Sequence, residues 1–159
     1  VFGSEKHKNI PLNFLNAVFN LQGDEKIADL DFLNLKQPPE ISSRKESVVD
    51  VLVRDQAGTK YIIEMQVAKG KGFEKRAQFY AAKTYCSHFK VGGQYHNLKK
   101  VIFLAITDYE IFPKKKERYK SDHVVLDNVS YENDLKDFSF TFVELPKFNK
   151  KLSELQLIN

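Results

Sequence analysis

Two acidic side chains and one amide occur in this sequence at a spacing that would let them act on one ligand. Asp50 ends one apolar run, the segment Glu64-Met65-Gln66 ends the next, and a turn that contains Gly58 separates the two runs. Carboxylate oxygens are the ligands that hard divalent cations such as Mg²⁺ prefer. These residue types therefore favour metal-assisted chemistry, provided that the fold brings the two runs side by side.

The two runs are expected to form a β-hairpin. Residues 47–53 and 60–67 are rich in β-branched side chains, and residues 55–59 between them have the composition of a turn. A three-residue loop that ends at Gly58, with this glycine at positive φ, makes the numbers of facing residues sum to 114.

This register determines which side chains share a face of the sheet. Asp50 lies directly opposite Glu64 when facing numbers sum to 114. Because side chains alternate along a strand, Gln66 follows Glu64 on the same face. The sequence therefore predicts that two carboxylates and an amide converge at one end of the hairpin.

Carboxylates that face each other across two strands repel, so something must offset their repulsion. A divalent cation would do so, and so would a raised pKa on one of the acids or an ion pair with Lys45 or Arg76. Both strands are otherwise apolar and are typical of central strands, in which buried acids without partners are costly. This setting favours a functional site over a solvated pair of surface charges.

Length and composition indicate an ordinary globular protein. The 159 residues are enough for one domain, and we expect residues 1–159 to form a single domain around one core. No apolar run is long enough to cross a membrane and no signal-peptide pattern is present, so a cytoplasmic location is expected. The single cysteine, Cys86, is interpreted as a small core residue on the apolar stripe of a helix.

Positive charge is concentrated after the hairpin. The chain has 25 Lys plus Arg against 21 Asp plus Glu, but residues 69–100 contain eight Lys or Arg and one acid. Residues 114–120 form a second basic cluster in an expected loop. Such clusters favour a polyanionic partner, because each neutralised phosphate releases counterions. The alternative is a solvated helix face with a solubilising loop.

Hydrophobic periodicity predicts an α/β fold. Helices are expected over residues 9–21 and 72–89, and strands over residues 27–35, 47–53, 60–67, 100–106, 123–126 and 138–145. The strand at 100–106 is a continuous apolar run that follows a long helix, so it should lie parallel to the second hairpin strand through a right-handed crossover. The expected order is helix, three strands, helix and strand, with extra strands at the end.

This order, together with an ordered set of short motifs, resembles the restriction-endonuclease-like PD-(D/E)XK nuclease superfamily. The chain is most similar to its branch of PD-(D/E)XK nuclease family transposases, the recombination-promoting nuclease (Rpn) group. The motifs span nearly the whole chain and are Val1-Phe2-Gly3, Phe14-Leu15-Asn16, Lys45-Glu46-Ser47-Val48-Val49-Asp50, Asp55 with Gly58, Ile63-Glu64-Met65-Gln66, Lys75-Arg76-Ala77 with Tyr80, Gly93 with Tyr95, and Glu144-Leu145-Pro146-Lys147-Phe148.

The resemblance implies a mixed sheet flanked by helices and a Mg²⁺-dependent nuclease, with Mn²⁺ as a substitute ion. By position, Asp50 and Glu64 would hold the metal together with the backbone carbonyl of Met65, and the catalytic residues would be Asp50, Glu64 and Gln66. Gln66 stands where the superfamily commonly has lysine. Its neutral amide can orient a nucleophile but cannot supply positive charge or transfer a proton. Glutamine is usual in the transposase-associated branch.

Substrate-binding roles are implied for Arg76, Tyr80 and Lys45. Arg76 would be directed to a phosphate, with Tyr80 one helical turn away beside it. An arginine that is ion-paired to Glu64 or Asp50 only to hold them in place is the alternative.

The resemblance leaves three functions to compare. The first is a Mg²⁺-dependent DNA endonuclease of recombination or transposition, with a homodimer as one arrangement. The second is a weakly active or inactive DNA-binding or interaction module that keeps the nuclease fold, and the third is a nuclease acting on RNA. Relatives usually extend beyond both ends of this sequence, so we expect an N-terminal nuclease-domain fragment truncated at both ends.

Overall fold

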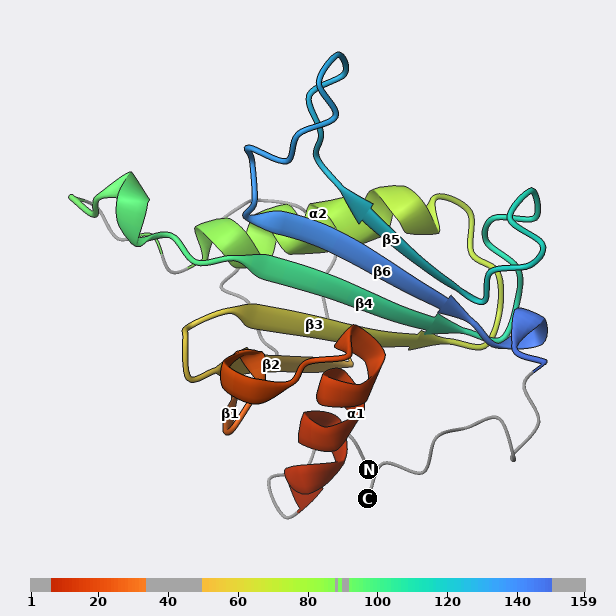
Figure 1. Cartoon of the computed structure of the whole chain (residues 1–159), viewed down its shortest axis with the longest axis horizontal. Helices are drawn as coiled ribbons and strands as arrows, with labels where there is room; N and C mark the ends of the chain where they lie inside the picture. Colours follow the sequence, from red (N-terminus) through yellow and green to blue (C-terminus); the bar gives the residue numbers. More distant parts are fainter. Residues whose placement is uncertain (1–6, 34–49, 88, 90–91, 150–159) are drawn as a thin grey trace.

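A computed structural model describes residues 7–33, 50–87, 89 and 92–149 of the chain (Figure 1). These residues form two α-helices and six strands: α1 (Asn9–Phe19), β1 (Leu30–Phe32), β2 (Val51–Asp55), β3 (Lys60–Gln66), α2 (Phe73–Cys86), β4 (Val101–Thr107), β5 (Lys120–Val124) and β6 (Phe138–Glu144). Short 3₁₀ turns occur at Gly23–Glu25, Tyr95–Asn97 and Leu145–Lys147. Within the described part, no helix is long and apolar enough to cross a membrane.

The six strands form one mixed sheet in the order β1-β2-β3-β4-β6-β5. Strands β1, β2 and β3 are antiparallel, β3, β4 and β6 are parallel, and β5 pairs antiparallel with β6. The parallel pairing of β3 with β4 was expected from the long helix between them and is confirmed. The order of helices and strands confirms the predicted α/β, restriction-endonuclease-like architecture.

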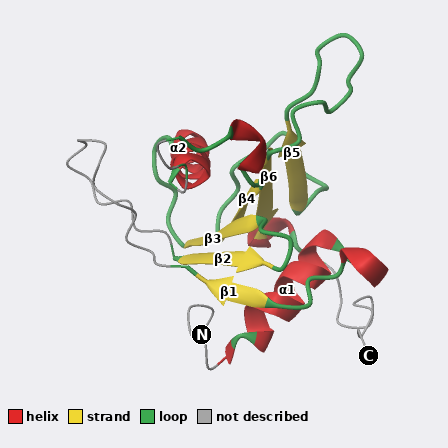
Figure 2. Cartoon of the chain, turned by 90° about the vertical axis from the view of Figure 1, so that its left-hand side faces the viewer, coloured by secondary structure: helices red, strands yellow, loops and turns green. Residues whose placement is uncertain are grey.

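The two helices cover opposite faces of the sheet (Figures 1 and 2). On one face, Phe73 and Ala77 of α2 pack with Ile62 and Phe103 of the central strands. On the other face, Leu15 of α1 packs in a second cluster of buried side chains with Val53, Ile63 and Leu104. Neighbouring residues of β3 therefore belong to different clusters, as the alternation of side chains along a strand requires.

The predicted hairpin register is confirmed. Val51 pairs with Ile63 and Leu52 with Ile62, so facing numbers sum to 114. The loop closes through a hydrogen bond of 3.0 Å from the Asp55 amide to the Thr59 carbonyl. Gly58 has a φ of +91°, which a glycine adopts without the strain that a side chain would cause. Asp50 lies in a bend directly before β2, one step beyond the paired residues.

Several element boundaries differ from those predicted. Helix α2 ends at Cys86 and not at residue 89, and β1 is limited to Leu30–Phe32 among the described residues. The fifth strand begins at Lys120, three residues before its predicted start. The interpretation of Cys86 as a core residue is wrong, because its side chain is exposed. Cys86 follows the buried Thr84 by two residues, which turns it to the opposite side of the helix.

Candidate active site

The predicted site residues gather at one edge of the sheet, where β3 and β4 both end. The parallel pairing of these strands places Gln66 beside Thr107. Asp50 reaches the same edge because β2 runs antiparallel to β3 and begins where β3 ends. The sequence predicted this convergence from the hairpin register, and the structure brings Asp50, Glu64 and Gln66 together.

Glu64 is the buried carboxylate of this edge, and its side chain is only 5% exposed. Its Oε1 accepts two hydrogen bonds, from Arg76 Nη2 at 3.1 Å and from Gln66 Nε2 at 3.0 Å. Its Oε2 is buried and has no hydrogen-bond partner in the described part of the chain. A buried carboxylate oxygen without a donor is unfavourable, so this atom calls for a cation or a hydrogen-bond donor beyond the described residues.

Asp50 is exposed and is held by the backbone of the opposite strand. Its Oδ2 accepts a hydrogen bond of 2.7 Å from the Met65 amide. The Met65 carbonyl in turn accepts a hydrogen bond of 3.2 Å from Gln66 Nε2. Asp50, Met65 and Gln66 are therefore fixed to each other beside Glu64 by short polar contacts.

The surroundings of Glu64 make its side chain harder to ionise than a solvated glutamate. Burial raises the pKa of Glu64, and the nearby charge of Asp50 raises it further, whereas Arg76 acts in the opposite direction. Two of the alternatives left open by the sequence thus occur together at Glu64. One acid has a raised pKa, and it forms an ion pair with Arg76.

Arg76 lies at the end of the first turn of α2, and its guanidinium contacts two aromatic rings. Its guanidinium carbon lies 4.9 Å from the ring centroid of Phe73 and 6.0 Å from that of Tyr80. Tyr80 is largely buried, and its pKa is raised by burial first and by the charge of Glu64 next. The rings restrict the guanidinium, while its Nε is buried without a partner among the described residues.

Tyr109 is a residue of this edge that the sequence did not single out. It follows β4 by two residues, and its hydroxyl is buried without a partner in the part of the chain that the structure describes. Burial raises its pKa, and the charges of Arg76 and Glu64 also act on it. No motif distinguishes this tyrosine, so only the fold reveals its place near the acids.

A buried ion pair fixes the loop that follows β4. Lys147 Nζ lies 2.8 Å from Glu144 Oε2, and the two side chains are 2% and 0% exposed. Glu144 Oε1 also accepts hydrogen bonds from the amides of Ile111 and Phe112, at 2.6 and 2.9 Å. The motif Glu144-Leu145-Pro146-Lys147 therefore has a structural role at the edge that carries Asp50 and Glu64, the pair called the acid cluster below.

The donor set fits a hard cation with oxygen ligands. It consists of the Asp50 carboxylate, the Glu64 carboxylate with its unpartnered Oε2, and the Met65 carbonyl. The described residues contain no group of three or more His, Cys, Asp or Glu side chains that could bind a metal ion. Mg²⁺ fits such a sparse set, because it usually takes one or two carboxylates and fills its remaining positions with water or phosphate oxygens.

Exposed basic residues occur in the segments that follow β3 and β4. Lys69 and Lys75 are exposed on either side of the start of α2, and Lys114 and Lys116 are exposed in the loop after β4. Lys115 of the same loop lies over the ring of Phe112, and the distance from its Nζ to the ring centroid is 5.0 Å. The predicted substrate-binding residue Lys45 lies outside the described residues.

Comparison with known families agrees with this geometry. A model of the family described as PD-(D/E)XK nuclease family transposase matches residues 1–158 of the chain. Searches of curated proteins and of solved structures found no significant match.

Proposed function

The chain belongs to the PD-(D/E)XK nuclease family transposases, as the sequence motifs indicated, and on this premise we propose that it hydrolyses DNA phosphodiester bonds with a divalent metal ion in recombination or transposition. The observation that carries the proposal is the buried Glu64 Oε2, which has no partner among the described residues and belongs to the residue directly before Met65, whose amide donates to Asp50.

Asp50, Glu64 and the Met65 carbonyl are the groups that would hold the ion, with Mg²⁺ preferred and Mn²⁺ as a substitute. When bound, such an ion activates a water molecule and stabilises the charge that develops on the phosphodiester. Burial of Glu64 favours metal binding, because a buried carboxylate is surrounded by a lower dielectric constant and attracts a neighbouring cation more strongly than a solvated one does.

Gln66 contributes an amide that is already oriented. Its Nε2 donates to Glu64 Oε1 and to the Met65 carbonyl, so the donors of the side chain are engaged. The remaining polar atom, Oε1, can accept a hydrogen bond from a water molecule and so orient it. An amide does not take up a proton at neutral pH, so we assign Gln66 a positioning role in the reaction.

Arg76 is suited to hold a phosphate next to the acids. One of its terminal nitrogens contacts Glu64, its Nε is buried and without a partner among the described residues, and a guanidinium can make two parallel hydrogen bonds to phosphate oxygens. Tyr80 packs beside the guanidinium and limits its movement. We also assign Lys45 a substrate-binding role, because the resemblance to the nuclease family implies it.

DNA is the proposed substrate because basic side chains flank the acid cluster. Lys69, Lys75, Lys114 and Lys116 are exposed around the edge where β3 and β4 end. Lysines placed in this way attract the phosphate backbone without reading its sequence. We further propose a cytoplasmic location, and a homodimer wherever both DNA strands are cut.

The ion pair between Arg76 and Glu64 favours a second candidate function. It satisfies Glu64 Oε1 without any metal, as a site that had become structural would. On this reading the chain is a DNA-binding or interaction module that keeps the nuclease fold.

The two candidates differ in a direct cleavage test. Supercoiled plasmid, linear duplex DNA and single-stranded RNA are incubated with Mg²⁺, Mn²⁺ or EDTA. The proposal expects DNA nicking with either ion and none with EDTA. DNA binding without cleavage under all conditions would support the non-catalytic module, and cleavage of RNA alone would replace DNA as the substrate.

A further inference from the structure

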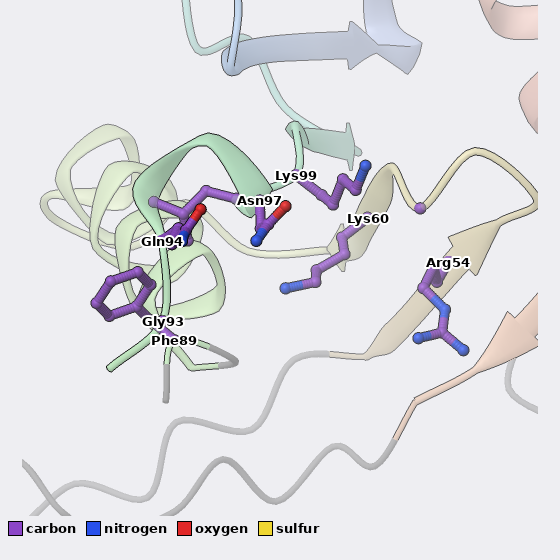
Figure 3. A pocket seen from close by; sticks show the side chains of 9 residues that line it. Arg54, Lys60, Phe89, Gly93, Gln94, Asn97 and Lys99 are labelled. Carbon is purple, nitrogen blue, oxygen red and sulfur yellow. The ribbon is translucent and has the colours of Figure 1, made fainter. Parts of the chain in front are cut away.

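We propose that a pocket at the opposite end of the sheet from the acid cluster binds a nucleotide unit, a phosphate group joined to a base. The pocket has a volume of about 370 Å³ and lies between the hairpin turn and the segment that precedes β4. Figure 3 shows Arg54, Lys60 and Lys99 on one side, and Gln94, Asn97 and Phe89 on the other. Pockets for small molecules begin at about 300 Å³, so one nucleotide unit is a suitable occupant.

The charge of the pocket selects an anion. Its described lining residues include two lysines and an arginine and no carboxylate. Arg54 is ion-paired at 2.9 Å with Asp31, which does not line the pocket. Lys60 is 95% buried among these lining residues. A phosphate group is the anion that such a group of cationic side chains suits.

The two lysines are held in place before any ligand binds. Lys60 Nζ donates to the Thr84 carbonyl, at 3.3 Å, in the last turn of α2. Three carbon atoms of the Lys99 side chain lie against Gly58, where an added Cβ would be 3.3–3.4 Å from them. Gly58 thus leaves room for the aliphatic part of the Lys99 side chain. Because both lysines are already held in place, a ligand that binds them loses less conformational entropy than one that must order mobile side chains.

Aromatic rings beside the cations provide a surface for a base. The ring of Phe89 lines the pocket and is stacked on the ring of Tyr95, with centroids 4.9 Å apart and planes inclined by 10°. Tyr95 is 78% exposed, so its ring has surface free for a further stacking partner. Basic side chains next to stacking aromatics are the combination with which proteins bind single-stranded nucleic acids.

The side-chain amides can contact the edge of a base. Gln94 and Asn97 belong to the turn that also carries Tyr95, and both line the pocket. An amide both donates and accepts hydrogen bonds, which matches the mixed donors and acceptors of a base edge. The hairpin thus supplies Arg54 and Lys60, and the segment 94–99 supplies the amides, the ring of Tyr95 and Lys99.

The pocket is separate from the acid cluster. Lys60 and Glu64 lie on the same strand four residues apart, about 13 Å at the usual rise of a β-strand. The nucleotide unit can come from a polynucleotide strand or from a free mononucleotide. Only the first source relates the pocket to the proposed nuclease function, and the pocket itself does not require cleavage.

Binding without metal tests the proposal independently of catalysis. The full chain in EDTA is titrated into a fluorescein-labelled twelve-residue oligo-dT, and fluorescence anisotropy gives Kd. The variants are Tyr95→Ala and Lys99→Glu. Their matched controls are Tyr131→Ala, an exposed tyrosine between β5 and β6, and Lys100→Glu, which changes the adjacent lysine that does not line the pocket. Thermal denaturation verifies that every variant is folded.

Tyr95→Ala is expected to raise Kd about fivefold or more, because stacking on an aromatic side chain contributes on that scale. Lys99→Glu should raise it by at least as much, while both controls stay within about twofold of wild type. Competition with dTMP and with inorganic phosphate identifies the source. If dTMP displaces the oligonucleotide at a much lower concentration than inorganic phosphate does, the base contributes to binding. If dTMP binds as tightly as the oligonucleotide, the ligand of the pocket is a free nucleotide.

Two results would overturn the assignment. The first is that the wild type shows no measurable binding of the oligonucleotide. The second is that Lys99→Glu and Lys100→Glu change Kd equally while Tyr95→Ala binds as tightly as wild type. If the wild type binds the oligonucleotide but does not cleave DNA, the proposed nuclease function fails and the pocket assignment stands. If the wild type cleaves DNA but no pocket variant changes oligonucleotide binding, only the pocket assignment fails.

Discussion

Arg76 and Glu64 meet through a single carboxylate oxygen. Arg76 Nη2 lies 3.1 Å from Glu64 Oε1, whereas Oε2 of the same carboxylate has no partner among the described residues. The ion pair therefore occupies one half of the carboxylate and leaves the other half for a ligand. Arg76 stabilises the ionised acid, and its positive charge also opposes the binding of a metal ion at the same group.

Replacing Arg76 should separate these two effects. Arg76→Gln removes a positive charge next to the proposed ligands, so we expect Mn²⁺ to bind more tightly, as measured by calorimetry. Plasmid cleavage should nevertheless fall by about 100-fold, because a donor to the phosphate is lost. Lys136→Gln, at an exposed site between β5 and β6, is the charge-matched control. Faster cleavage by Arg76→Gln would assign Arg76 a purely restraining role.

Gln66 should affect the reaction more than DNA binding. Gln66→Ala removes the hydrogen bonds to Glu64 Oε1 and the Met65 carbonyl, and residues that orient metal ligands typically contribute about 10-fold to 100-fold in activity. We expect a loss of that size in cleavage rate with unchanged DNA affinity. Gln78→Ala, on the exposed side of α2, should behave as wild type. Wild-type cleavage by Gln66→Ala would show that the amide is dispensable.

The ion pair of Glu144 with Lys147 should contribute mainly to stability. Lys147→Met leaves a fully buried carboxylate without its cation, which should reduce the free energy of unfolding by about 3–5 kcal/mol. The double variant Glu144→Gln/Lys147→Met keeps an acceptor for the amides of Ile111 and Phe112 and should recover part of the loss. Urea denaturation measures both. Equal stability of the single and double variants would contradict a coupled pair.

His123 should make stability depend on pH. Burial first, and the charge of Lys115 next, lower its pKa in the folded protein, while Asp122 acts in the opposite direction. The unfolded chain therefore takes up a proton more readily, so this contribution to stability is present above about pH 6.5 and is lost as the pH falls. In thermal denaturation between pH 7.5 and 5, wild type should lose more stability than His123→Gln. Parallel profiles would exclude the effect.

The sequence predicted the hairpin and its acid pair in detail because these depend on local rules. A three-residue loop ending in glycine determines the register, and alternation then puts Glu64 and Gln66 on one face. The orientation of Arg76 toward Glu64 depends on how α2 packs on the sheet, so the sequence left it open. Tyr109 reaches the site through a loop held by Glu144, a contact across 33 residues that no local pattern contains. Cys86 was misplaced because α2 turns its last residue away from the core.

The central claim is that Asp50 and Glu64 act together on a metal ion, and single-atom substitutions test it most directly. Asp50→Asn, Glu64→Gln and the control Glu74→Gln, at an exposed site in the first turn of α2, are compared in nicking of supercoiled plasmid with Mg²⁺. We predict losses of about 100-fold or more for the first two variants and wild-type nicking for the third. Nicking by Asp50→Asn and Glu64→Gln at the wild-type rate would contradict the assignment.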